Sequence, residues 1–301
     1  MLVWSVASQK GGVGKTTTVA SLAGWLQKEG LRVLAVDTDP HASLTAYLGY
    51  GDESVERNLY DLYKCQDLSL DEVRGAITYT RFRGLDLIAS SMALATTDRQ
   101  LSGRAGVGRI LSRILAYLED DYDVILIDCP PVLGALMVNA LAASSLVIVP
   151  TQTDFLAMKG LEGMIKTFGI MQKASGGKEL DHIVVPTMCD DSDPECEESL
   201  AKLRRRYQGK VWDKVIPPDD GFAISSSRQM PLPLMNRRCR GSEAYRKLLD
   251  CCIAHALENC PEKVSQKLID LTKKADQSHT SPSASELLTD DLNSMLGPGE
   301  F

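Results

Sequence analysis

Short apolar runs alternate along the chain with longer segments in which apolar residues recur at helical spacing. Residues 2–7 form an apolar run, a glycine-rich turn follows, and 16–29 carries apolar residues every three or four positions. This pattern predicts a buried strand, a tight turn and a helix with one apolar face. The alternation continues, with further strands predicted at 32–36, 85–89, 123–127, 146–150, 183–186 and 211–216, and further helices at 107–118, 156–172 and 242–257.

Strands that are separated by helices predict right-handed β-α-β units, because two parallel strands need a crossover connection. The expected fold class is therefore α/β, with a mostly parallel, twisted sheet and helices on both faces. Ligands of such sheets bind outside the carboxyl ends of the strands. We therefore expect functional side chains directly after the predicted strands.

The composition of the chain changes after the last of these helices. Residues 1–260 are expected to form the folded domain, and 261–277 a basic C-terminal helix that packs on it rather than on lipid. Its narrow apolar stripe consists of Val264, Leu268 and Leu271. Residues 278–301 begin as a flexible linker rich in Ser and Thr and end in an acidic, Leu-rich tail. We expect this tail to be a tethered docking motif for a groove on a partner protein.

A glycine-rich loop lies between the first predicted strand and the first predicted helix, which is the setting of a phosphate-binding P-loop. Its residues are Lys10, Gly11, Gly12, Val13, Gly14, Lys15, Thr16 and Thr17. Glycines let the backbone approach phosphate oxygens, Lys15 supplies a positive charge, and the Thr16 hydroxyl can complete a Mg²⁺ shell. The sequence therefore predicts a site for a nucleoside triphosphate with Mg²⁺.

The loop departs from the common pattern at its start, where Gln9 replaces the usual first glycine and Lys10 follows. A second lysine beside an already cationic loop gains little unless it meets more phosphate charge. A nucleotide that is held by a neighbouring subunit would supply that charge.

Three aspartates follow predicted strands. Asp37 and Asp39 come at the end of the second strand, where alternate residues face the same side, so both are expected to point toward the phosphates. Asp128 ends the apolar strand at 123–127, where a carboxylate can hold a Mg²⁺-bound water. Each aspartate alone is compatible with a helix cap or a turn, but together with the loop they predict one catalytic and metal site.

Charge and composition exclude several classes of protein. The formal net charge of −7 opposes uniform adsorption to nucleic acid or anionic lipid, so such binding would need a local patch. No apolar run approaches the roughly 18 residues of a membrane span, and the start lacks the features of a signal peptide. We therefore expect a cytoplasmic protein. None of the eight cysteines forms a C-x-x-C pair, and we expect them to be reduced and mostly packing residues.

Two basic clusters precede the tail and are candidates for contacts with DNA phosphates. They consist of Arg204, Arg205 and Arg206, and of Arg228, Arg237 and Arg238. The first cluster also fits a solvated helix face that pairs with Glu197 and Glu198, so both interpretations stay open.

At this point the chain resembles the ParA/MinD family of P-loop ATPases. The loop at 10–17 has the family's deviant Walker A form, Lys-Gly-Gly-x-Gly-Lys-Thr-Thr. The resemblance covers most of residues 1–257 and leaves out the tail. It extends through Val-Asp-Thr-Asp-Pro-His at 36–41, the strand to Asp128, Val-Pro-Thr-Gln-Thr-Asp at 149–154, Pro-Thr-Met at 186–188 and Ile-Pro at 216–217.

The resemblance implies a P-loop NTPase fold with ATP and Mg²⁺ as cofactors. Lys10 would be the signature lysine that reaches across an ATP-sandwich homodimer, and Lys15 would hold phosphates in its own subunit. Asp39 would position or activate the attacking water, while Asp37 and Asp128 would support Mg²⁺. The residues implied near adenine are Met188, Pro217 and Asp219.

The resemblance also implies slow ATP hydrolysis that a partner protein stimulates, in a cycle between an ATP-bound dimer and a monomer that positions a cargo. Residues 41–45 and the acidic, Leu-rich tail look most like the ParC-type members, which position chemotaxis arrays at bacterial poles. Recruitment to the nucleoid or to a cell pole is therefore expected, and possible DNA binding would be independent of sequence.

Several alternatives stay open. One is a plasmid or chromosome partition ATPase, and another is a MinD-like regulator of flagellar number or division at the membrane, although the acidic tail disfavours lipid. An iron–sulfur carrier would need bridging cysteine pairs, and a GTPase would need an Asn-Lys-x-Asp signature; the sequence has neither.

Overall fold

The computed structural model describes residues 1–101, 107–190, 192–235 and 239–272. Seven strands within these ranges form one sheet in the order β3-β4-β2-β5-β1-β6-β7. Neighbouring strands are parallel except for β3 and β4, which confirms the prediction of a mostly parallel sheet. The strands are β1 Leu2–Val6, β2 Val33–Asp37, β3 Ile77–Tyr79, β4 Leu85–Ile88, β5 Val124–Asp128, β6 Leu146–Thr151 and β7 His182–Pro186.

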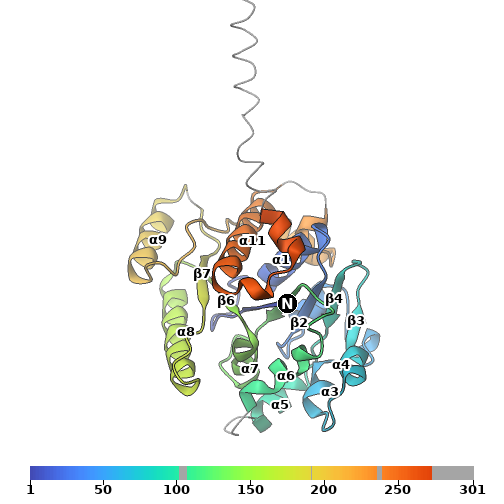
Figure 1. Cartoon of the computed structure of the whole chain (residues 1–301). Coiled ribbons are helices and arrows are strands. Elements are labelled where there is room, and N and C mark those ends of the chain that lie inside the picture. Colours follow the sequence, from blue (N-terminus) through green and yellow to red (C-terminus); the bar gives the residue numbers. More distant parts are fainter. Residues whose placement is uncertain (102–106, 191, 236–238, 273–301) are drawn as a thin grey trace, which may run out of the picture.

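Helices cover both faces of the sheet, with α1 and α11 on one face and α6 and α7 on the other (Figure 1). The α-helices are α1 Lys15–Lys28, α2 Ser43–Tyr47, α3 Leu59–Lys64, α4 Leu70–Gly75, α5 Leu94–Leu101, α6 Ile110–Ala116, α7 Ala135–Ala143, α8 Phe155–Ala174, α9 Pro194–Arg206, α10 Asp220–Ser227 and α11 Arg240–Asn259. Short 3₁₀ turns lie at Asp52–Ser54, Val107–Arg109, Leu232–Met235 and Pro261–Lys263.

The apolar strands form these layers because their side chains alternate between two cores. On β1, Leu2 and Trp4 enter the core beneath α1 and α11, whereas Val3 enters the core beneath α6 and α7. Every residue of β1, β2 and β5 is buried. Burial on both faces explains why these strands read as continuous apolar runs, and it fixes their carboxyl ends at one edge of the sheet.

The prediction of a strand at 211–216 is wrong. The segment makes only two isolated bridges, Val184 with Val211 and Thr187 with Ile216, because it bends away between them at Asp213 and Lys214. The seventh strand is instead β3, an antiparallel edge strand of three residues. So short a strand, with only partly buried side chains, carries little periodic signal.

The described part of the predicted C-terminal helix packs on the domain. Residues 266–272 are helical, and Leu268 and Leu271 are buried in the same core as α1 and α11. The linker and the acidic tail at 278–301 lie outside the described residues. Within the described ranges, no helix combines the length and apolar character that crossing a membrane requires.

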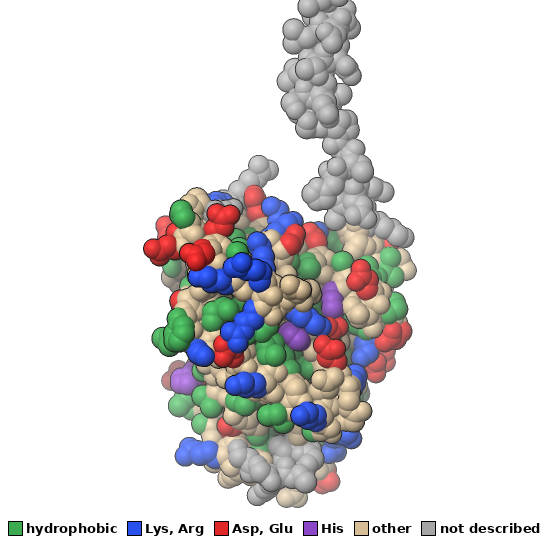
Figure 2. Space-filling view, turned by 90° about the vertical axis from the view of Figure 1, so that its left-hand side faces the viewer, with side chains coloured by type: hydrophobic (Ala, Val, Ile, Leu, Met, Phe, Trp, Pro, Cys, Tyr) green, Lys and Arg blue, Asp and Glu red, His purple; other side chains and the backbone are tan. Residues whose placement is uncertain are grey.

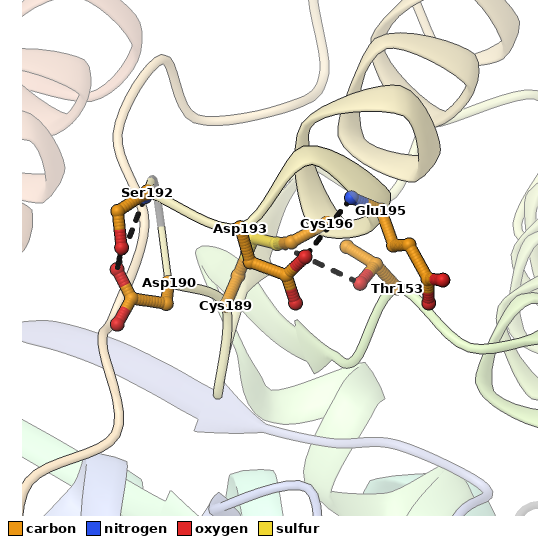
Figure 3. Close-up of a disulfide and its surroundings, with 7 residues drawn as sticks. All are labelled: Thr153, Cys189, Asp190, Ser192, Asp193, Glu195 and Cys196. Carbon is orange, nitrogen blue, oxygen red and sulfur yellow. Dashed lines mark hydrogen bonds between the residues drawn. A yellow bond between two sulfur atoms is a disulfide. The ribbon is translucent and has the colours of Figure 1, made fainter.

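Cys189 and Cys196 form a disulfide, so the expectation of reduced cysteines is wrong for this pair (Figure 3). Their Cα atoms lie 5.9 Å apart, within the ordinary range for a disulfide. The chain after β7 turns back at Asp190 and Asp193 and brings Cys196, in the first turn of α9, against Cys189. No other disulfide joins the described residues.

Candidate nucleotide site

The predicted P-loop wraps the N-terminus of α1. Gly12 and Gly14 have φ values of 74° and 91°, in the left-handed region where a side chain is strained, so glycine is needed at both positions. Lys15 is the first residue of α1, and its buried side chain extends back over the loop, with Nζ 3.3 Å from the carbonyl oxygen of Lys10. The backbone amides and Lys15 therefore share one concave face, as phosphate binding requires.

The loop is held by residues from three elements of the fold. The Thr187 hydroxyl, just after β7, donates to the carbonyl oxygen of Val13 at 3.0 Å. The Thr18 hydroxyl donates to the carbonyl oxygen of Gly14 at 2.7 Å and lies 2.8 Å from the Tyr245 hydroxyl of α11. Sequence reasoning missed Thr187 and Tyr245 as supports, because neither is near the loop in the chain.

Asp37 and Asp128 lie side by side, since β2 and β5 are neighbours and these two residues are direct partners in register. The Thr16 hydroxyl donates to Asp128 Oδ2 at 2.6 Å. The structure thus brings together Thr16, Asp37 and Asp128, the three residues that were predicted to support Mg²⁺.

Burial disfavours the charged form of both carboxylates and raises their pKa values. Burial raises the pKa of Asp37 to about 6, even though its carboxylate accepts hydrogen bonds from the amide and hydroxyl of Thr45 and from the amide of Asp39. Burial, and next the charge of Asp37, raise the pKa of Asp128 well above its ordinary value. Asp128 Oδ1 is buried and has no hydrogen-bond partner within the described residues.

A divalent cation fits this arrangement, because it would neutralise the carboxylate pair and use the oxygen that has no partner. No group of three or more His, Cys, Asp or Glu side chains in the described ranges is placed to hold a metal by itself. Mg²⁺ commonly takes one or two protein ligands and completes its shell with phosphate oxygens and water. Thr16 and Asp128 provide that kind of partial shell.

Asp39 follows β2 and is almost completely buried. Its amide donates to Asp37 Oδ1 at 3.1 Å, and the Ser90 hydroxyl donates to its carbonyl oxygen at 2.6 Å. Its Oδ1 accepts from the amide of His41 at 3.0 Å and lies 2.8 Å from His41 Nδ1. Asp39 is therefore held directly beside Asp37, and its role toward the attacking water stays a prediction. His41 is a contact that the sequence did not indicate.

Lys10 is bound within its own subunit. Its ammonium group donates to Gln152 Oε1 at 2.7 Å and to Asp154 Oδ2 at 2.5 Å. Asp154 also caps α8, since its Oδ1 accepts from the Ala157 amide at 3.0 Å. Partial burial opposes ionisation of Asp154, but the hydrogen bonds from Lys10 and Ala157 outweigh it and lower its pKa. Gln152 and Asp154 were not predicted as site residues, although both follow β6.

The three residues implied near adenine make different contacts in the structure. Met188, with a φ of 54°, is half exposed, and its sulfur accepts from Gln152 Nε2 at 2.7 Å. Pro217 lines a cavity of about 540 Å³ between α9 and α11, a volume in the range of small-molecule sites. The Asp219 carboxylate accepts from the amides of Gly221 at 2.7 Å and Gly241 at 2.9 Å, so it joins α10 to α11. Their role toward adenine stays a prediction.

The predicted DNA arginines that the structure describes lie on two elements, α9 and the C-terminal end of α10. Arg204 donates to the carbonyl oxygen of Asp213 at 2.5 Å, and Arg206 pairs with Glu162 at 2.9 Å. Arg205 is exposed on α9, and Arg228 is the exposed C-cap of α10. Figure 2 shows the side that carries α8 and α9, where a group of Lys and Arg side chains adjoins a group of Asp and Glu. Arg237 and Arg238 lie outside the described residues.

Comparison with known proteins agrees with this geometry. A family model described as an AAA domain matches residues 1–181. The sporulation initiation inhibitor protein Soj of Bacillus subtilis is 33% identical over 244 residues, which cover 81% of this chain and 95% of Soj. The chromosome partitioning protein ParA of Caulobacter vibrioides is 34% identical over 248 residues, which cover 82% of this chain and 91% of ParA.

A solved structure is similar as well. Cobyrinic acid a,c-diamide synthase from Mycobacterium smegmatis, with bound ATP analog and magnesium, superposes with a TM-score of 0.72 at 32% identity and covers 88% of this chain and 98% of that chain. The phosphate loop, the carboxylate pair and these similarities lead to one conclusion. The chain belongs to the ParA/MinD family of P-loop ATPases and uses ATP and Mg²⁺.

Proposed function

We propose that the protein is a positioning ATPase that cycles between an ATP-bound homodimer and a monomer and thereby places a cargo in the cell. The observation that carries the proposal is the different setting of its two lysines. Lys15 is buried in its own phosphate loop, whereas the side chain of Lys10 is 26% exposed at the rim of the site. A lysine at the rim can reach the phosphates of a nucleotide that is bound to a second subunit.

Exposed apolar residues near Lys10 support the proposal that a second subunit binds there. Phe155 and Leu156, directly after Asp154, are 73% and 68% exposed. Val132 and Leu133, which follow β5 at the same edge of the sheet, are also exposed. Large apolar side chains that gather on one surface of a monomer commonly mark an interaction site. Here each pair lies within a few residues of a site residue, Asp128 or Asp154.

The roles of the residues follow from where they are held. The loop amides and Lys15 would hold the phosphates, and Thr16 and Asp128 would hold Mg²⁺, which would neutralise phosphate charge. Asp39 is fixed by Asp37 and His41 at the end of β2, where its carboxylate can orient the attacking water and accept its proton. Lys10, once released from Asp154, adds positive charge at the phosphates across the dimer.

Three variants test the cycle. We expect Lys15→Ala to lose nucleotide binding, Lys10→Ala to bind nucleotide without forming a productive dimer, and Asp39→Ala to accumulate as an ATP-bound dimer. Fluorescent-nucleotide binding, light scattering and phosphate release measure the three properties. Normal ATP-dependent dimers of Lys10→Ala would contradict the proposal.

We propose the chemotaxis array at the cell pole as the cargo, with a stimulating partner protein that docks on the ATPase. Residues 41–45 and the acidic tail support this choice. In cells that carry Asp39→Ala, a fluorescent array marker should leave the pole while plasmid and chromosome inheritance stay normal. Arrays that stay polar while a plasmid is lost would favour the partition alternative.

We also propose that the dimer travels on DNA without reading its sequence. Arg205 and Arg228 are exposed, whereas Arg204 and Arg206 contact Asp213 and Glu162. If the dimer makes about six phosphate contacts, its affinity for DNA should fall about a thousandfold when the salt concentration rises from 50 to 200 mM. Retention of the ATP form on DNA resin should therefore fall steeply with salt and fall again in Arg205→Ala and Arg228→Ala. Equal retention on neutral resin would contradict DNA binding.

A further inference from the structure

The disulfide lies against the segment that holds Lys10. Cys189 directly follows Met188, whose sulfur accepts a hydrogen bond from Gln152 at 2.7 Å. At the other end, the Thr153 hydroxyl lies 3.9 Å from the sulfur of Cys196 (Figure 3). Both half-cystines therefore adjoin residues 152–154, and Gln152 and Asp154 of this segment bind the Lys10 ammonium group.

Residues 187–189 also support the phosphate loop. Thr187 lies two residues before Cys189 and donates to the carbonyl oxygen of Val13 at 3.0 Å. The disulfide fixes this stretch to the first turn of α9. Reduction of the disulfide would remove a covalent restraint from residues 187–189. These residues contact both Gln152, which binds Lys10, and the phosphate loop that contains Lys15.

A cavity borders the disulfide at Cys189. Cys189 is buried, but it lines the cavity of about 540 Å³ that lies between α9 and α11. Leu200 and Trp212 form apolar parts of the cavity wall. Its charged lining is mixed, with basic Arg204, Lys214, Arg240 and Lys247 and acidic Glu197, Asp213 and Glu243. The cavity volume suits a small molecule rather than a protein chain.

We propose that Cys189 and Cys196 are a reversible redox site that controls the release of Lys10. As a disulfide, the pair holds residues 152–154 in place and keeps Lys10 on Asp154. As two thiols, the pair lets this segment move, so that Lys10 can reach the nucleotide of a second subunit. The second step rests on the homodimer that is proposed above.

The chemistry balances with a low-molecular-weight disulfide such as oxidised glutathione. One cysteine thiolate attacks that disulfide and releases one small thiol; the second thiolate then attacks the mixed disulfide and releases the other. The two cysteines lose two electrons and two protons, which the two small thiols carry away. A dithiol reductant reverses the reaction. In reducing compartments the disulfides that do form are commonly transient and regulatory.

The test compares the two redox forms of the full chain in buffers with fixed ratios of reduced to oxidised glutathione. Mass spectrometry of the intact protein shows whether Cys189 and Cys196 are oxidised. The direct readout is the rate at which an amine-reactive probe acylates Lys10 in the nucleotide-free protein, measured by peptide mass spectrometry. Reduction should raise this rate severalfold, up to about fivefold, because an exposed ion pair contributes at most about that factor. The second readout is the ATP-dependent dimer fraction, which should rise with the first.

Matched variants separate the pair from the other cysteines. Cys196→Ser and Cys189→Ser should behave like the reduced protein in every buffer, and Cys65→Ser, on α3's C-cap, should keep the wild-type response. Asp154→Asn should label quickly in both redox forms. Equal Lys10 labelling of both forms, or a pair that stays reduced in oxidised glutathione, would overturn the inference. A redox effect on labelling without any dimer would instead contradict the proposed function and leave the redox site standing.

Discussion

At the scale of single residues, the strongest physical constraint is the carboxylate pair at the ends of β2 and β5. The pKa of Asp37 is about 6 in the folded chain, against an ordinary value of 3.8. Because the folded value is the higher one, its contribution to stability is complete below about pH 4 and is lost as pH rises through about 6.

We expect the free energy of unfolding of the protein without Mg²⁺ to fall between about pH 4 and pH 6, and Mg-ATP to restore it. Asp128→Asn should flatten this pH dependence, because it removes a carboxyl whose pKa burial and the charge of Asp37 raise well above its ordinary value, and it should weaken Mg-ATP binding at least about tenfold. Thermal denaturation with and without Mg-ATP measures both effects. The exposed Asp67→Asn is the control, and a wild-type curve for Asp128→Asn would contradict the coupling.

A second residue-scale prediction concerns Asp154. Asp154→Asn removes the charge that faces Lys10 but keeps an oxygen that can cap α8, so the fold should be unaffected. With Lys10 less firmly held, half-maximal dimerisation should need about two- to fivefold less ATP, the effect of a partly exposed ion pair. Light scattering against ATP concentration measures the shift. An unchanged or higher ATP requirement would show that Asp154 does not restrain Lys10.

At the scale of elements, α1 is fixed by close packing as well as by the loop before it. Gly24 of α1 lies against the turn Leu232–Met235, and a Cβ there would come within 2.7 Å of Pro231 Cβ and 3.1 Å of Pro233 Cδ. Overpacking of this kind costs about 1–3 kcal/mol, more than the gain of up to about 1 kcal/mol from replacing a helical glycine.

Gly24→Ala should therefore lower the free energy of unfolding by about 1–2 kcal/mol. Gly169→Ala in α8 is the matched control, because a Cβ there meets nothing within 4 Å. It should raise the free energy of unfolding by about 0.5–1 kcal/mol. Urea denaturation of both variants measures the difference, and equal signs would contradict the packing argument.

At the scale of the whole molecule, nucleotide chemistry and cargo placement should be separable. The site is built from β1, β2, β5, β6 and β7 with the loops that follow them, whereas residues 278–301 lie outside the described structure. Deleting 278–301 should leave ATP hydrolysis and thermal stability unchanged and abolish partner capture and polar placement. Placement that survives the deletion would show that the partner binds the folded domain instead.

The sequence predicted most of the site because the relevant information is local. The glycines at 12 and 14 demand a left-handed turn, and Asp37 and Asp128 each end an apolar strand, so a parallel sheet brings them to one edge. The strand predicted at 211–216 was wrong because burial of Trp212 and Ile216 does not by itself produce a continuous hydrogen-bonded ladder.

Other features depend on which segments meet across the fold. Lys10 binds Gln152 and Asp154, 142 and 144 residues away, because β6 lies beside β1. Cys189 meets Cys196 only because the chain reverses between β7 and α9. Local sequence therefore determined the phosphate loop and the strand-end carboxylates, whereas strand order and chain reversal decided what restrains Lys10 and which cysteines pair.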